Sequence, residues 1–164
     1  MTEYLSCADT ARLIRAALAR SFPGTKFSVR SSVYTGGASI RVRYDGITGY
    51  APVVCHCPAG MTIDPSGGVE CGTCGYRGRV TPIYRPGAPT RGAVYAVVGP
   101  FSASGFDGMS DLKYPITAYV DASGAIVGSR SPGAYGSVRA WDDEPDGARA
   151  VDFGADFIFV EATL

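Results

Sequence analysis

The sequence is short of the residues on which membrane spans and many enzyme sites depend. It has a single histidine and no uninterrupted run of about 18 apolar residues, the length that crosses a bilayer. The first residues lack a basic start followed by an apolar stretch, so we expect no signal peptide. These absences favour a cytoplasmic location without a membrane partner, and the lone histidine leaves no convincing nucleophile–base pair, which argues against an enzyme.

Lysine is also scarce, because thirteen of the fifteen basic residues are arginine. Residues 10–91 hold eleven basic and three acidic residues, whereas residues 141–164 hold seven acids and one arginine. The planar arginine fork makes paired hydrogen bonds with carboxylates and phosphates. The bias therefore has two interpretations. It indicates a basic face that binds nucleic acid or an acidic partner, or it indicates two halves of the chain that neutralise each other in the fold.

Cysteine is rare as well, yet four of the five cysteines and the histidine lie within VCHCPAGMTIDPSGGVECGTCG, residues 54–75. In the Cys-Gly-Thr-Cys-Gly part, a tight turn aims both sulfurs at one point. Two cysteine pairs joined by a loop can supply the four ligands that zinc prefers. We predict one structural Zn²⁺, because four protein ligands leave no open coordination position. The predicted ligands are Cys55, Cys57, Cys71 and Cys74.

The residues of this cluster leave alternatives open. His56 could replace one cysteine or remain outside the ligand set. An iron–sulfur cluster uses the same ligand types, and Cys71 with Cys74 could form a redox pair. A disulfide is disfavoured in the reducing cytosol. The fifth cysteine, Cys7, is expected to be a small buried apolar side chain.

Hydrophobic periodicity predicts the elements around the cluster. A helix begins at Ser6 and ends near Ser21, with an apolar stripe that includes Ile14 and Leu18. Residues 27–44 alternate as an antiparallel hairpin that turns at 34–37 and holds Arg41 and Arg43 opposite the core. We further expect a strand at 93–98, a loop at 99–113, a hairpin of strands 114–120 and 126–130, a loop at 131–149 and a strand at 155–162.

The predicted fold class is α+β, with the N-terminal helix packed on a mainly antiparallel sheet. Residues 47–92 are rich in Gly, Pro and Thr and show little periodicity. We interpret them as an inserted zinc-ribbon-like module that metal binding would fold. Residues 1–46 and 93–164 would then form the core domain.

Three stretches carry a resemblance to a known family: ADTARLIRAALARSFPGTKF, SVRSSVYTGGASIRVRYDG and FSASGFDGMSDLKY. Together they resemble large polyvalent protein associated domain 29, over residues 4–46 and roughly 93–125. The resemblance implies an accessory protein of a phage or conjugative plasmid, acting in the host cytoplasm and often encoded near counter-defence genes. It brings no catalytic residues.

Two binding functions are expected, and one catalytic function is disfavoured. The first is a non-enzymatic inhibitor of the anti-CRISPR or anti-restriction type, in which Arg41 and Arg43 grip an acidic patch of a host defence complex and residues 142–146 mimic phosphates. The alternative is nucleic-acid binding by the zinc module. Its predicted binding residues are Tyr76, Arg77, Arg79 and Arg85.

A nuclease site of Asp107, Asp111 and Lys113 would bind a catalytic metal. It is disfavoured because the two acids are only four residues apart, whereas such sites take their first acid from a separate strand.

Overall fold

The structure is a computed structural model, and it describes residues 1–51, 61–63, 68–75, 77–79, 81–107, 112–131 and 145–164. The chain divides into two compact units. Unit 1 comprises Met1–Asp45 and Thr90–Ala162, and unit 2 comprises Gly46–Pro89 and Thr163–Leu164. Within the described residues, the helices are too short or too polar to span a bilayer.

Unit 1 begins with a short strand, β1 (Glu3–Leu5), and the helix α1 (Cys7–Ser21). The Ser6 side chain caps α1 by accepting a hydrogen bond of 3.1 Å from the backbone N–H of Asp9. Such a cap satisfies a donor that has no partner within the helix. The buried residues of α1 are Cys7, Thr10, Ala11, Ile14, Ala17 and Leu18. The predicted helix and the burial of Cys7 are confirmed, whereas β1 was not predicted.

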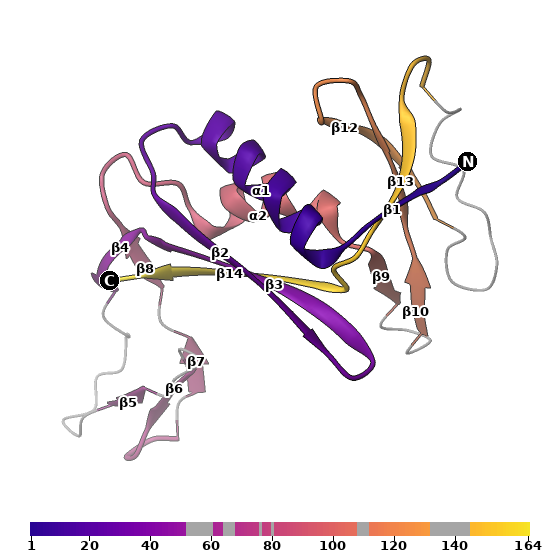
Figure 1. Ribbon diagram of the computed structural model, residues 1–164. Coiled ribbons are helices and arrows are strands. Elements are labelled where there is room, and N and C mark those ends of the chain that lie inside the picture. Colours follow the sequence, from indigo (N-terminus) through magenta and orange to yellow (C-terminus); the bar gives the residue numbers. More distant parts are fainter. Residues whose placement is uncertain (52–60, 64–67, 76, 80, 108–111, 132–144) are drawn as a thin grey trace. The chain divides into compact units, whose positions relative to one another are not determined.

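The predicted hairpin is formed by β2 (Phe27–Tyr34) and β3 (Gly37–Asp45), which pair antiparallel. Gly36 has φ +88° in the turn, a conformation that glycine adopts without strain. Successive side chains of a strand point to opposite faces, so one face of the hairpin is buried under α1 while the other is exposed. A third strand, β14 (Phe157–Thr163), lies beside β3 and completes the order β14-β3-β2 (Figure 1).

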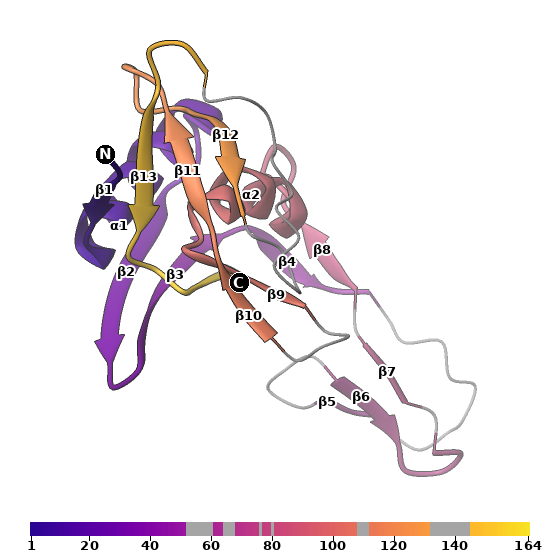
Figure 2. The same ribbon diagram turned by 90° about the vertical axis from the view of Figure 1, so that its right-hand side faces the viewer.

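The second sheet of unit 1 has the order β1-β13-β11-β12 (Figure 2). Strands β11 (Thr117–Val120) and β12 (Ile126–Arg130) form the second predicted hairpin. Its turn is stabilised by the Asp121 carboxylate, which accepts from the backbone N–H groups of Ser123 and Ala125 at 2.8 and 3.0 Å. The strand β13 (Arg149–Phe153) was not predicted, and it pairs antiparallel with β11 and parallel with β1.

The segment predicted as a strand at residues 93–98 is a helix, α2 (Arg91–Val98). Thr90 caps it by accepting a hydrogen bond of 3.1 Å from the Ala93 N–H. Val94 and Val98, one helical turn apart, are fully buried, and α2 contacts α1. β-Branched side chains have only a weak preference against helices, and the burial of this face outweighs it.

The loop predicted at residues 99–113 also contains regular structure. A 3₁₀ turn η1 (Gly99–Phe101) precedes the strands β9 (Ser104–Asp107) and β10 (Leu112–Pro115), which pair antiparallel. Gly105 permits this close pairing, because a Cβ on it would lie 2.3 Å from the Tyr114 ring. Residues 108–111 and 132–144 lie outside the described residues, and with them Asp111 and most of the acidic segment 142–146.

Unit 2 contains two small antiparallel sheets. In one, β4 (Ile47–Tyr50) pairs with β8 (Pro82–Tyr84). In the other, β6 (Gly68–Cys71) lies between β5 (Met61–Ile63) and β7 (Arg77–Arg79). With two helices and mainly antiparallel sheets across the described residues, the predicted α+β class is confirmed.

Gly154, just after β13, sets how closely the chain approaches the junction between β1 and α1. We predict that Gly154→Ala lowers the free energy of unfolding by about 1–3 kcal/mol, because its Cβ would lie 2.6 Å from the backbone O of Leu5 and 2.7 Å from the backbone N of Cys7. Thermal unfolding followed by circular dichroism measures the effect. The matched control is Gly24→Ala, which meets nothing within 4 Å and should not destabilise. Equal melting temperatures for the two variants would contradict the prediction.

Candidate functional site

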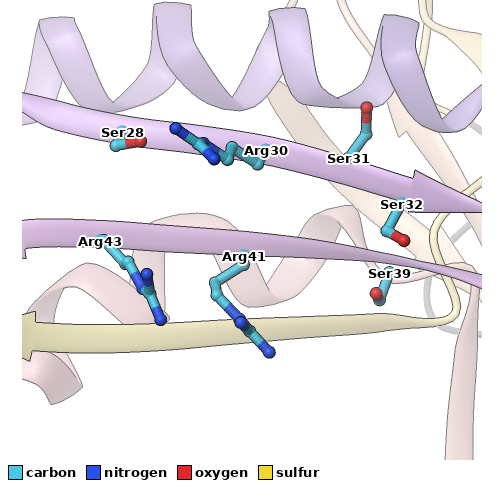
Figure 3. A pocket seen from close by; sticks show the side chains of 7 residues that line it. All are labelled: Ser28, Arg30, Ser31, Ser32, Ser39, Arg41 and Arg43. Carbon is cyan, nitrogen blue, oxygen red and sulfur yellow. The ribbon is translucent and has the colours of Figure 1, made fainter.

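The exposed face of the β2–β3 hairpin gathers arginine and serine side chains. The register pairs Ser28 with Arg43, Arg30 with Arg41, and Ser32 with Ser39, and the period of two sends all of these side chains to the solvent side. They line an open pocket of about 330 Å³, together with Ser31 (Figure 3). We call this surface the arginine face and define it by Ser28, Arg30, Ser32, Ser39, Arg41 and Arg43.

The arginine face carries an excess of positive charge. Glu161 of β14 contacts Arg41 at 3.5 Å and Arg43 at 2.5 Å, so one carboxylate serves two guanidinium groups. Figure 3 shows both arginines extending over β14. The Arg30 side chain makes no hydrogen bond or ion pair with any residue that the structure describes. Because these ion pairs are solvent-exposed, each contributes only about 0.2–1 kcal/mol, and an incoming anion can compete for the same arginines.

Exposed aromatic rings border the arginine face on β14. Phe157 and Phe159 alternate with Ile158 and Val160, which pack against the core on the opposite face. The two phenylalanines therefore share the outer face with Glu161. They are 47% and 48% exposed, and their ring centroids are 6.3 Å apart. This sheet face thus combines arginine, serine hydroxyls and apolar rings.

Asp156 aligns β14 with β3. Its backbone N–H donates to the Ala38 carbonyl at 2.9 Å, and its side chain accepts from the Ala38 N–H at 3.1 Å. Glu161 lies five residues after Asp156, Arg43 lies five residues after Ala38, and these two side chains form an ion pair. The strands β14 and β3 therefore run in the same direction. The Lys113 ammonium donates to the other carboxylate oxygen at 2.5 Å. This bond, followed by the one from Ala38, lowers the pKa of Asp156 against the opposing effect of burial.

We predict a pH-dependent contribution of Asp156 to stability. Since its folded-state pKa lies below the unfolded value, the contribution is present above the unfolded pKa of about 3.8 and is lost as the pH falls through the folded pKa. Asp156→Asn should lower the free energy of unfolding by about 1–2 kcal/mol near neutrality, and the difference from wild type should shrink below about pH 4.

Denaturant unfolding at a series of pH values measures this difference. Asp146→Asn, at an exposed turn position, is the control and should have little effect. A difference for Asp156→Asn that stays constant from pH 7 down to pH 3 would refute the role assigned to its carboxylate.

The structure describes half of the predicted metal ligands. Cys71 ends β6 and is buried, and Cys74 is exposed in the following turn. Gly75 closes this turn with φ +67° and a hydrogen bond of 2.9 Å from its N–H to the Cys71 carbonyl. Cys55, His56 and Cys57 lie outside the described residues, so the zinc site stays a prediction.

The predicted binding residues fall into both units. Arg41 and Arg43 lie on the arginine face of unit 1. In unit 2, Arg77 and Arg79 lie in β7, paired with Glu70 and Gly68, and Arg85 is exposed just after β8. Tyr76 lies outside the described residues. Lys113 of the disfavoured nuclease site pairs with Asp156.

Sequence reasoning missed several members of the arginine face. Arg30 could have been found, because the turn at residues 34–37 fixes the register that places it opposite Arg41. The approach of Glu161, Phe157 and Phe159 has no comparable local signal, because it depends on the pairing of β14 with a strand more than one hundred residues earlier.

The comparisons with known proteins agree with part of the resemblance seen in the sequence. Residues 5–48 match the model of the family described as large polyvalent protein associated domain 29. This segment is similar to that domain. It covers about a quarter of the chain and includes α1, β2, β3 and the whole arginine face. The match supports an association with phages and other mobile elements. No curated protein and no solved structure matched the chain.

Proposed function

We propose that this protein is a non-enzymatic accessory protein of a phage or plasmid that inhibits a host defence complex by binding it through the arginine face. The family match supports the mobile-element setting. The observation that carries the binding role is the arginine face itself, which presents three exposed arginines on a sheet whose opposite face is buried. A CRISPR effector or a restriction enzyme is the kind of partner that this role implies.

The geometry favours binding because the arginines are held in place before a partner arrives. Their backbone belongs to a hairpin with eight paired positions, so recognition does not require ordering a loop. Arginine forks bind carboxylates and phosphates through paired hydrogen bonds. Arg30 can bind such a group directly, whereas Arg41 and Arg43 would replace their ion pairs with Glu161 by bonds to the partner's anion.

We predict that the double variant Arg41→Ala/Arg43→Ala loses inhibition of the host defence system. The fold should be retained, because exposed ion pairs contribute at most about 1 kcal/mol each. The measurements are phage plating or plasmid transformation in a host with an active defence system, and pull-down from its lysate. The control is Arg20→Ala, which removes an exposed arginine from the last turn of α1.

The proposal fails if wild-type protein inhibits no such system and captures none of its components. It also fails if inhibition survives in the double variant. A loss of inhibition in Arg20→Ala as well would indicate a general charge effect and would likewise count against the arginine face.

A second candidate function is nucleic-acid binding by unit 2 around a structural zinc. The register of β5 and β6 favours the predicted ligand set, because Met61 pairs with Cys71. The chain therefore enters β5 at the end of the sheet where the Cys71–Cys74 turn lies. Cys57 precedes Met61 by only four residues, a span of at most about 14 Å. The arginines of this function would be Arg77, Arg79 and Arg85, with Tyr76 for stacking.

We predict one zinc ion per chain by elemental analysis of the purified protein. The double variant Cys71→Ser/Cys74→Ser should lose it, because two of the four thiolate ligands are removed. Cys7→Ala is the matched control and should keep the metal, because Cys7 is buried in the core of unit 1. Wild-type protein without zinc, or with iron in its place, would refute the zinc site. The nucleic-acid function would be refuted separately by the absence of binding at low salt.

A further inference from the structure

We infer that the arginine face binds single-stranded nucleic acid, with the backbone phosphates on its arginines and the bases on the rings of β14. The inference rests on the proposed function in using the same face. It adds the chemical class of what this face contacts, namely a nucleic-acid strand that a defence complex carries or exposes. It differs from the second candidate function, which uses unit 2.

The charges of the face match a phosphate chain. Arg30 and Arg41 lie directly opposite each other, where side chains of adjacent strands are about 4.5–5.5 Å apart at Cβ. Arg41 and Arg43 follow each other along β3 at a spacing of about 6.7 Å. Like charges placed directly opposite repel, and Glu161 neutralises only part of this charge. A flexible polyanion laid along the face relieves the repulsion at all three positions.

The aromatic rings distinguish a nucleic-acid strand from other anions. Bases stack on exposed aromatic side chains next to basic residues, and this combination is how sheet surfaces bind single strands. Phe159 presents its ring beside the Phe157 ring, and the Lys113 ammonium lies 5.4 Å from the Phe157 centroid. Tyr34 adds a third exposed ring at the turn end of the hairpin.

A duplex and an acidic protein each leave part of this surface without a partner. In a duplex the bases are stacked on one another, so their faces cannot contact Phe159. An acidic protein patch would use the arginines but has no requirement for two half-exposed phenylalanines. The serine hydroxyls of the face, at positions 28, 32 and 39, both donate and accept, which suits base edges and sugar hydroxyls.

The test measures fluorescence anisotropy of the full-length protein with labelled probes, from about 50 to 200 mM salt. The probes are oligouridylate and oligothymidylate strands of about 12 nucleotides, a duplex of equal length and an oligoglutamate peptide. We expect the single strands to bind more tightly than the duplex. Arg30→Ala should weaken binding and reduce the slope of log affinity against log salt by about 0.7.

Phe159→Ala should weaken single-strand binding about fivefold to a hundredfold and leave the salt slope unchanged, because stacking releases no counterions. Phe159→Tyr keeps the ring and should keep the affinity. The matched controls are Arg20→Ala on α1 and Tyr95→Ala on α2, which remove an exposed arginine and an exposed aromatic ring elsewhere on unit 1. Both should bind as wild type does.

Three outcomes would overturn the inference. Binding of the peptide without the strands would assign the face to an acidic protein and leave the proposed function standing. Equal affinity for duplex and single strands, with no effect of Phe159→Ala, would assign it to polyanions in general. Single-strand binding that survives Arg30→Ala and Phe159→Ala but is lost in Arg77→Ala/Arg79→Ala would assign it to unit 2.

Strand binding without any inhibition of defence would instead remove the proposed function and leave the inference intact.

Discussion

The register between β2 and β3 is the constraint on which the rest of unit 1 depends. Side chains alternate between the two faces of a strand, so a slip of one residue would exchange the buried and exposed sets. In the observed register, Val29 and Val42 face the core together while Arg30 and Arg41 face solvent together. The left-handed conformation of Gly36 closes the turn that selects this register.

The energies of the two faces differ, and the buried face decides where the arginines lie. Full burial of one Val or Ile side chain stabilises a fold by about 1.5–3 kcal/mol, whereas an exposed ion pair contributes about 0.2–1 kcal/mol. Burial of Ile40 and Val42 therefore outweighs the repulsion between Arg30 and Arg41 and the weak attraction of Glu161. A surface with unbalanced charge and exposed rings is tolerated because the opposite face holds the strands in place.

Local sequence signals predicted the elements whose stability is mainly local. The cap at Ser6 and the stripe of α1 predicted that helix, and the alternation on both sides of a glycine turn predicted the β2–β3 hairpin. The errors fall where distant contacts decide the structure. Residues 93–98 resemble a strand in composition, yet Val94 and Val98 are buried on one face of a helix that contacts α1. The strand β13 pairs with β1 and β11, which both lie far from it in the sequence, and no local pattern identified it.

The candidate site also has one part that local sequence signals predict and another that depends on distant contacts. The sequence by itself predicted that Arg41 and Arg43 face away from the core, whereas Arg30 was identified only from the register in the structure. The spacing of the cysteines likewise predicts a metal site, because that chemistry needs only ligand type and spacing. Only the tertiary structure decided that Glu161 and Phe159 border the arginines. Their strand pairs with β3 across more than one hundred residues, and that pairing follows from burial of the whole core of unit 1 rather than from any short segment.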